Sequence, residues 1–305
     1  MRKRATASSR GSVVERAAEQ LGAIGTIEPL IRPSQEELAR PLQDNPVAEV
    51  RPLTRAAPPV AEINFLRMRS AGILTPEVSS GRTMEEFRLI KRSVLQTIRT
   101  LKDEDVANSN VTMVTSTRPG EGKTFTAINL AMSLALERDY SVLLIDADVS
   151  RPSILKSLGL TAAKGLIELI EDRSLDLDDV IIKTNVKNLS VLPVVSSDSR
   201  STELLSSKRM NELIQEIRRR QENRIVIFDS PPVLATSEPA ALAAHVGQII
   251  FTVEAGRTTK ASVREALDLL GKRTRIGFVL NRAEKQMGSV YFGSYYHSYS
   301  ARDGR

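Results

Sequence analysis

Two glycines, a lysine and a threonine in the stretch PGEGKT are the residues of this sequence best suited to chemistry. Gly120 and Gly122 allow backbone N–H groups to turn inward around a polyphosphate. Lys123 can reach the outer phosphates, and the hydroxyl of Thr124 can ligate Mg²⁺. The stretch departs from the pattern GxxxxGK[ST] at its first position, which is Thr117. The sequence therefore predicts a phosphate-binding loop.

The elements on either side of this loop must hold it in place. An apolar run rich in β-branched residues begins at Val111 and predicts a buried strand, and apolar residues after the loop recur at helical spacing. The free N–H groups in the first turn of such a helix attract negative charge. We expect nucleotide contacts from Thr117, Arg118, Pro119, Gly120, Glu121, Gly122, Lys123, Thr124 and Phe125, and from Asn281 at the end of the last predicted strand.

Three aspartates follow two further apolar runs. Asp146 and Asp148 come directly after a predicted strand at 142–145, and Asp229 closes a strand at 225–228. Because ligands bind at the carboxyl ends of strands in open α/β sheets, these carboxylates are candidate Mg²⁺ ligands. An apolar run ending in Asp after a phosphate loop is the Walker B pattern, which places Asp229 there. Each carboxylate could instead cap or form the turn after its strand.

Strands and helices alternate along most of the chain. Further strands are predicted at 189–194, 248–253 and 275–280, and helices near 163–170, at 201–221 and around 263–270. This alternation predicts an α/β fold, a doubly wound parallel sheet with helices on both faces. The nucleotide is then expected along the C-terminal edge of the strands.

Composition narrows the kinds of site. The 305 residues, 41% of them hydrophobic, suffice for one large α/β domain with extra segments. There is no cysteine and there are only two histidines, so we expect any metal to be held by oxygen. The net charge of +6 is compatible with nucleic acid, an anionic membrane or ATP, and does not decide between them. With no apolar run of the length that spans a bilayer and no signal-peptide core, we expect a cytoplasmic protein.

The two ends of the sequence differ in composition from its middle. Residues 13–22 could form a short helix, and the proline-rich stretch 31–60 is typical of a linker. We therefore expect an N-terminal helix and linker at 1–75, a phosphate-loop domain at 76–284 and a tyrosine-rich tail at 285–305. The tail contains four tyrosines that are candidate phosphoacceptors: Tyr291, Tyr295, Tyr296 and Tyr299. Alternatively, the tail is a stacking surface for nucleic acid or an aggregation-prone segment.

A strongly amphipathic helix is predicted to begin at Thr83. Glu85, Arg88 and Arg92 fall on the side opposite its apolar stripe, and Lys91 lies near the boundary. By spacing alone this is a solvated charged face with local ion pairs.

PGEGKT, the DAD sequence after the second strand, DSPP after the third and the tail tyrosines together resemble the bacterial tyrosine kinases (BY-kinases) of polysaccharide export. The stretches EEFRLIKR, DADVSRP and DSPPVLATSE are most similar to autokinases encoded with exosortase-type exopolysaccharide loci. The resemblance covers residues 83 to 305. It implies a kinase that uses ATP and Mg²⁺, phosphorylates the tail tyrosines of a neighbouring subunit, and thereby regulates exopolysaccharide chain length, polymerisation or export.

The resemblance also implies roles for single residues. The catalytic residues would be Lys123, Asp146, Asp148 and Asp229, and the metal ligands Thr124, Asp146, Asp148 and Asp229. Either Asp146 or Asp148 would accept the tyrosine proton. The subunits would meet through Glu85, Arg88, Lys91 and Arg92.

The sequence departs from the family's pattern at three positions. Ser150 separates the DAD motif from Arg151, and Lys91 stands where the interface motif has arginine. Arg118 stands where related cell-division and plasmid-partition ATPases carry a signature lysine. This leaves as an alternative a partition-type or positioning-type ATPase switch without kinase activity. The tail tyrosines, which such a switch does not need, favour the kinase.

The resemblance implies partners as well. We expect a homo-oligomer, which could be a ring, and a separate membrane protein of the chain-length-determinant class. That partner would recruit the kinase to the inner face of the plasma membrane, and contact with the membrane would occur only through it. The sequence contains no recognition motif for nucleic acid, so no nucleic-acid partner is expected.

Overall fold

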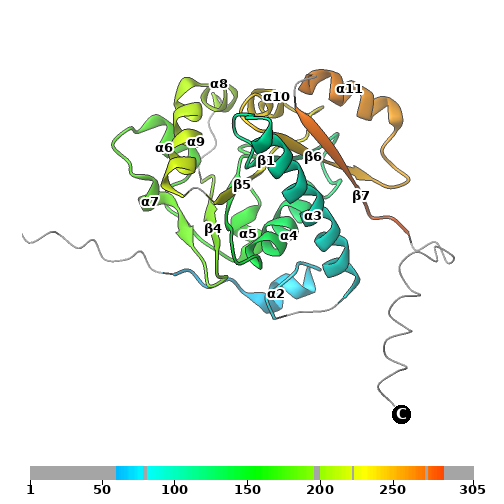
Figure 1. Cartoon of the computed structure of the whole chain (residues 1–305), viewed down its shortest axis with the longest axis horizontal. Helices are drawn as coiled ribbons and strands as arrows, with labels where there is room; N and C mark the ends of the chain where they lie inside the picture. Colours follow the sequence, from blue (N-terminus) through cyan, green and yellow to red (C-terminus); the bar gives the residue numbers. More distant parts are fainter. Residues whose placement is uncertain (1–59, 78–80, 196–199, 222, 272–273, 285–305) are drawn as a thin grey trace, which may run out of the picture. The chain divides into compact units, whose positions relative to one another are not determined.

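The computed structural model describes residues 60–77, 81–195, 200–221, 223–271 and 274–284. These ranges contain a seven-stranded sheet in the order β3-β4-β2-β5-β1-β6-β7 (Figure 1). The strands are β1 Val111–Ser116, β2 Ser141–Asp146, β3 Ile182–Lys183, β4 Leu189–Leu192, β5 Arg224–Asp229, β6 Gln248–Glu254 and β7 Arg275–Asn281. Every neighbouring pair is parallel except β3 with β4. The predicted doubly wound sheet is confirmed, and the short antiparallel strand β3 was not predicted.

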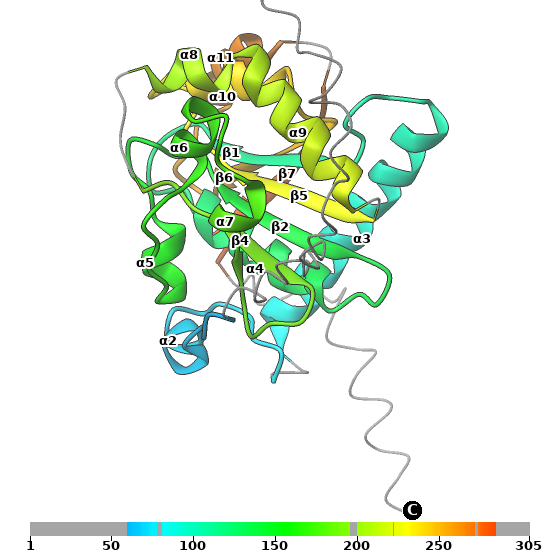
Figure 2. The ribbon, with the colours of Figure 1, turned by 90° about the vertical axis from the view of Figure 1, so that its left-hand side faces the viewer.

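Helices cover both faces of the sheet. One face carries α2 Phe65–Ser70, α3 Arg82–Asp103, α4 Lys123–Ala135 and α5 Ile154–Leu158. The other carries α6 Leu166–Glu171, α7 Leu177–Val180, α8 Ser201–Leu205, α9 Lys208–Arg220, α10 Glu238–Ala243 and α11 Lys260–Leu270. Figure 2 shows α8 and α9 above the strands and α2 and α4 below them. None of the helices in the described ranges is long and apolar enough to cross a membrane.

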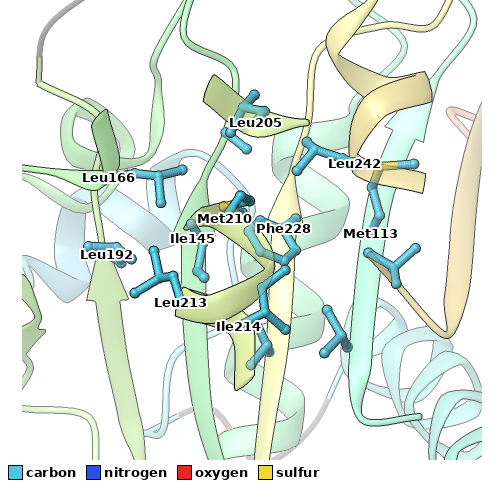
Figure 3. Close-up of a cluster of buried hydrophobic side chains, with 14 of the residues drawn as sticks. Met113, Ile145, Leu166, Leu192, Leu205, Met210, Leu213, Ile214, Phe228 and Leu242 are labelled. Atoms are coloured by element: carbon cyan, nitrogen blue, oxygen red, sulfur yellow. The ribbon is translucent and has the colours of Figure 1, made fainter. Parts of the chain in front are cut away.

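Each face of the sheet has its own hydrophobic core because successive strand residues point to opposite sides. In β5, Val226 and Phe228 pack toward α9, whereas Ile225 and Ile227 pack toward α4. Figure 3 shows the core on the α9 side, where Leu213 and Ile214 lie over Phe228. Burial on both faces explains why the central strands are almost uniformly apolar.

The packed domain begins earlier than the predicted residue 76. Ala61 forms a parallel bridge with Thr184 of the turn after β3, and the N-cap Asn64 starts α2 by accepting from the N–H of Arg67. Met68 of α2 is fully buried, and the N–H of Leu74 donates to the side chain of Asn129 in α4 at 2.8 Å. Residues 61–75, predicted as part of the N-terminal segment, therefore pack on the phosphate-loop domain. Residues 1–59, including the predicted helix at 13–22, lie outside the described ranges.

The predicted long helix at 201–221 is wrong in one respect, since it is two helices. α8 ends at Leu205, and the side chain of Ser207 accepts from the N–H of Met210 to start α9. Serine is a favoured N-cap because its hydroxyl satisfies a free N–H of the first turn. The apolar period continues across the break, and for this reason the period alone did not reveal it.

Candidate active site

The phosphate loop joins the buried strand β1 to α4, as predicted. Gly122 is the N-cap of α4 with φ of 95°, and Gly120 has φ of 91°. Both values lie in the left-handed region, which favours glycine. A Cβ on Gly122 would lie 2.0 Å from Nδ2 of Asn281, so this position also lacks room for a side chain. Within the described residues no side chain caps the first turn of α4, which leaves its N–H groups for an anion.

Thr117 explains the departure of the loop from the usual pattern. Its hydroxyl donates to the carboxylate of Glu121, which is only 4% exposed. The same carboxylate accepts from the N–H of Arg118 at 2.9 Å and from the hydroxyl of Thr258. Glu121 therefore braces the loop from within and ties it to the segment between β6 and α11. The prediction of Glu121 as a nucleotide contact had not anticipated this role, and the participation of Thr258 was missed altogether.

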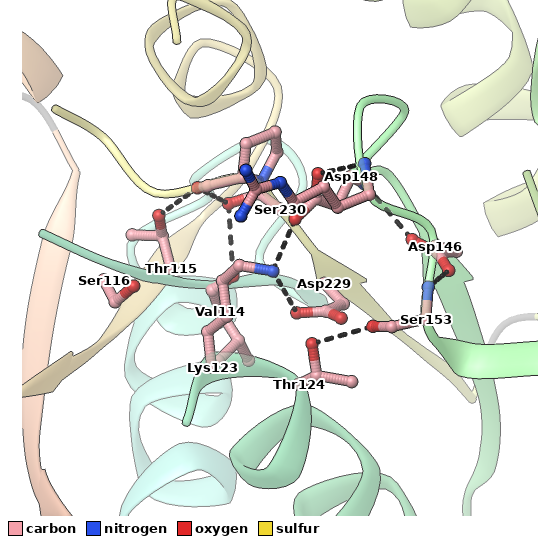
Figure 4. Close-up of polar contacts among 12 residues, drawn as sticks. Val114, Thr115, Ser116, Lys123, Thr124, Asp146, Asp148, Ser153, Asp229 and Ser230 are labelled. Atoms are coloured by element: carbon pink, nitrogen blue, oxygen red, sulfur yellow. Dashed lines mark hydrogen bonds and ion pairs between the residues drawn. The ribbon is translucent and has the colours of Figure 1, made fainter. Parts of the chain in front are cut away.

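Lys123 lies between two buried carboxylates (Figure 4). Its Nζ is 2.6 Å from Oδ2 of Asp148 and 3.9 Å from Oδ1 of Asp229. Burial by itself acts to lower the pKa of this lysine, but the charges of Asp229 and Asp148 outweigh it and the pKa is raised. Lys123 therefore stays protonated and provides the positive charge that a phosphate requires.

Asp229 is a buried carboxylate that has Lys123 as a charged neighbour but no close hydrogen bond. Its side chain is fully buried, and neither oxygen accepts a hydrogen bond from the described residues. Burial raises its pKa to about 6, although the nearby charge of Lys123 and the hydroxyl of Thr124 act in the opposite direction. A carboxylate at this depth without a hydrogen bond of normal geometry is costly unless it serves a ligand. It fits a bound Mg²⁺ or a water molecule held by one.

Asp146 performs the turn-forming role that the sequence also allowed. One oxygen accepts from the N–H of Asp148 at 3.2 Å, and the other accepts from the N–H groups of Ser153 and Ile154, both at 3.0 Å. Burial and the charge of Asp229 raise its pKa to about 7 in spite of these donors. Asp146 thus fixes the segment that carries Asp148 and starts α5.

Thr124, the predicted Mg²⁺ ligand of the loop, faces α5. Its hydroxyl lies 3.1 Å from the hydroxyl of Ser153, the N-cap of that helix (Figure 4). The described residues contain no group of three or more His, Cys, Asp or Glu side chains that could hold a metal by themselves. The donor set here, one hydroxyl and the carboxylate of Asp229, suits Mg²⁺, which typically takes its other ligands from water and substrate phosphates.

The remaining predicted contacts divide into two groups. Arg118, Pro119 and Gly120 are exposed at the tip of the loop, and Asn281 donates to the backbone oxygen of Glu121 at 2.9 Å. Phe125 differs, because its ring packs edge-on against Phe87 of α3 with centroids 6.1 Å apart. Only the backbone of Phe125 is therefore left to contact a nucleotide, and its side chain belongs to the packing of α3 on α4.

The predicted subunit-contact residues lie on α3, with intramolecular partners for three of them. Arg88 forms an ion pair with Glu85 one turn away, as the spacing predicted. Lys91 pairs with Glu137, just after α4, at 2.5 Å, and Arg92 is exposed. The predicted phosphoacceptors Tyr291, Tyr295, Tyr296 and Tyr299 lie outside the described residues.

This chain is similar to several known proteins. Residues 109–269 match the family model described as an AAA domain. Tyrosine-protein kinase YwqD of Bacillus subtilis is 33% identical over 181 residues, which cover 59% of this chain and 75% of YwqD. A larger relative is the putative tyrosine-protein kinase EpsB of Ralstonia solanacearum. It is 29% identical over 236 residues, and the match covers 76% of this chain but only 30% of EpsB.

Two solved kinase domains are similar in structure. The VpsO kinase domain is 31% identical with a TM-score of 0.53, and the match covers 65% of this chain and 98% of that one. The kinase domain of Escherichia coli tyrosine kinase ETK is 28% identical with a TM-score of 0.53, covering 60% of this chain and 71% of that one.

Proposed function

This chain belongs to the bacterial tyrosine-protein kinases, and on that premise we propose that it transfers phosphate from ATP to the tyrosines of its own tail in a neighbouring copy. The observation that carries the proposal is the position of Lys123 and the fully buried Asp229 beside a phosphate loop whose glycines have left-handed conformations. The acceptors would be Tyr291, Tyr295, Tyr296 and Tyr299.

The residues suited to hold Mg²⁺ and ATP are the backbone of the loop, Lys123, Thr124 and Asp229, with Asn281 beside the loop. ATP would supply the phosphoryl group, and Mg²⁺ would supply positive charge that offsets the charge of the phosphates. The protein's contribution is then positioning and electrostatics, since little covalent chemistry is left for side chains.

We assign the role of proton acceptor to Asp148 in preference to Asp146. The carboxylate of Asp146 is occupied by three backbone N–H groups. Asp148, by contrast, accepts one backbone N–H, from Arg151, and holds Lys123 with its other oxygen at 2.6 Å. When Lys123 turns to a phosphate, Asp148 loses this partner and its oxygen becomes able to accept the proton of a tyrosine hydroxyl. The same lysine would therefore couple phosphate binding to activation of the acceptor.

The wider role rests on the resemblance of the sequence to the kinases of polysaccharide export. We propose that the kinase regulates exopolysaccharide chain length, polymerisation or export at the inner face of the plasma membrane. A membrane protein of the chain-length-determinant class would recruit it, and copies would assemble, in a ring if the rotation closes, through Glu85, Arg88, Lys91 and Arg92. The exposed side chain of Arg92 on α3 is compatible with such a contact.

Mixing two forms of the chain tests the phosphorylation. A Lys123→Met chain of altered mass, checked for folding by circular dichroism, is incubated with wild type, Mg²⁺ and ATP, and tail phosphates are mapped by mass spectrometry. We expect phosphotyrosine on the inactive chain, and none on an acceptor that also carries phenylalanine at all four tail tyrosines. An unlabelled inactive chain beside a self-phosphorylating wild type would rule out transfer between subunits. Absence of any phosphotyrosine would rule out the kinase itself.

A further inference from the structure

A basic hollow lies on the α3 face, far from the phosphate loop. It is lined by Lys91, Arg92, Leu95, Gln96 and Arg99 of α3 and by Glu137, and its volume is about 470 Å³. Glu137 follows the C-terminal end of α4, whereas the phosphate loop precedes the N-terminal end. The 13 residues of α4 separate the two by about 20 Å. The hollow is therefore a site separate from the proposed nucleotide site.

The charges of the hollow leave two arginines for an anion. Lys91 offsets Glu137 through their ion pair at 2.5 Å. Arg92 and Arg99 are exposed, and neither forms an ion pair with any of the described residues. They stand seven residues apart, which puts them on the same side of α3 and about 10 Å apart along its axis. Gln96 lies between them as a further hydrogen-bond donor, and Leu95 adds an apolar wall.

We propose that this hollow binds a phosphotyrosine in the tail of a second copy of this chain. The proposal rests on the proposed function, because the kinase must first place the phosphate there. Guanidinium groups pair with phosphate through two parallel hydrogen bonds and also stack on aromatic rings. A phosphotyrosine offers both the phosphate and the ring, whereas a phosphoserine offers no ring for Leu95 and the arginines to contact.

The charge of the tail makes the binding conditional on phosphorylation. Residues 285–305 contain Lys285, Arg302 and Arg305 but only Asp303 as an acidic residue. Without phosphate the tail is therefore basic and is repelled by the hollow. Each phosphotyrosine adds about −1.5 to −2 charges at pH 7, which reverses the sign of the interaction.

Occupation of the hollow would also affect assembly. Lys91 and Arg92 belong both to the hollow and to the proposed subunit contact. A phosphotyrosine bound there competes with a neighbouring subunit for the same side chains. Binding of the phosphorylated tail and the proposed subunit contact through Lys91 and Arg92 would therefore exclude each other.

Binding of synthetic peptides tests the site without any kinase activity. Peptides of residues 289–301 are prepared unphosphorylated, phosphorylated on Tyr295 and Tyr296, or phosphorylated on Ser298 and Ser300, and their binding to the full-length Lys123→Met chain is followed by fluorescence anisotropy. We expect the phosphotyrosine peptide to bind at least tenfold more tightly than either of the others. Arg92→Ala with Arg99→Ala should weaken it at least tenfold. Arg264→Ala, which removes an exposed arginine of α11 outside the hollow, should leave it unchanged.

Two kinds of result would overturn the proposal. The first is equal binding of the three peptides. The second is an affinity for the phosphotyrosine peptide that the Arg92 and Arg99 substitutions leave unchanged in a folded chain. Either would show that the hollow does not bind phosphotyrosine specifically. Vesicles containing phosphatidylglycerol form the last arm. If they bind through Arg92 and Arg99 while the phosphotyrosine peptide does not, the surface is a membrane contact. Because no arm uses ATP, failure here is distinguishable from failure of the proposed kinase function.

Discussion

Substitution of Gly122 by alanine should damage the phosphate loop in two separable ways. The first is backbone strain, because φ is 95° at this position and a left-handed conformation costs a residue with a Cβ about 1–2 kcal/mol. The second is a clash, since the new Cβ would lie 2.0 Å from Nδ2 of Asn281. Asn281 must then move, and its hydrogen bond to Glu121 contributes about 1 kcal/mol. We expect Gly122→Ala to lower the free energy of unfolding by about 2–3 kcal/mol in the absence of nucleotide.

Gly120→Ala is the matched control. Gly120 has φ of 91°, but nothing lies within 4 Å of its would-be Cβ, so this variant reports the strain alone. Asn281→Ala reports the hydrogen bond alone. In the double variant of Gly122 and Asn281 the lost hydrogen bond is counted once, so its destabilisation should fall short of the sum of the single variants by about 1 kcal/mol.

Urea unfolding of the four variants and the wild type at pH 7.5 measures these differences, and thermal unfolding supports them. For a domain of this size, 1 kcal/mol corresponds to a shift in Tm of about 2–4 °C. If Gly122→Ala is no less stable than Gly120→Ala, or if the double variant is strictly additive, Asn281 does not press on the loop and the reasoning fails.

Two further predictions concern the buried aspartates. Because burial raises the pKa of Asp229 from 3.8 to about 6, the folded state holds its proton more tightly than the unfolded state, and wild-type stability falls as the pH rises through that range. Asp229→Asn should therefore gain stability relative to wild type between pH 5 and pH 8, by about 1.4 kcal/mol in urea unfolding, while kinase activity is lost; the exposed Asp139→Asn is the control, and an equal difference at both pH values would contradict this. Asp146→Ala, which removes the acceptor oxygen, should speed hydrogen exchange of the Ser153 and Ile154 amides about fivefold, since each lost hydrogen bond contributes about 1 kcal/mol. Ser153→Ala keeps its backbone donor and should not, and unchanged exchange in Asp146→Ala would show that this carboxylate does not hold the turn.

The sequence alone determined the class of fold and predicted where the candidate site lies. Period-two and period-3.6 patterns are local, so the runs at Val111, at 142–145 and at 225–228 predicted buried strands without knowledge of their neighbours. The phosphate loop is local as well, because its glycines, Lys123 and Thr124 are consecutive. Since the carboxyl ends of parallel strands meet at one edge, the aspartates after two strands could be placed near the loop in advance.

The tertiary structure decided which partner each polar side chain takes. Glu121 and Thr258 are 137 residues apart, and no local pattern relates them. Lys123 contacts Asp148, and Asp146 accepts from backbone N–H groups. Asp229 has no hydrogen bond of normal geometry from the described residues. These partners likewise depend on where three strands and a helix meet. Residues 60–75 joined the domain for the same reason, because the bridge from Ala61 to Thr184 and the burial of Met68 need surfaces formed more than 50 residues later. Burial and hydrogen bonding are properties of the assembled core, and spacing along one segment cannot specify them.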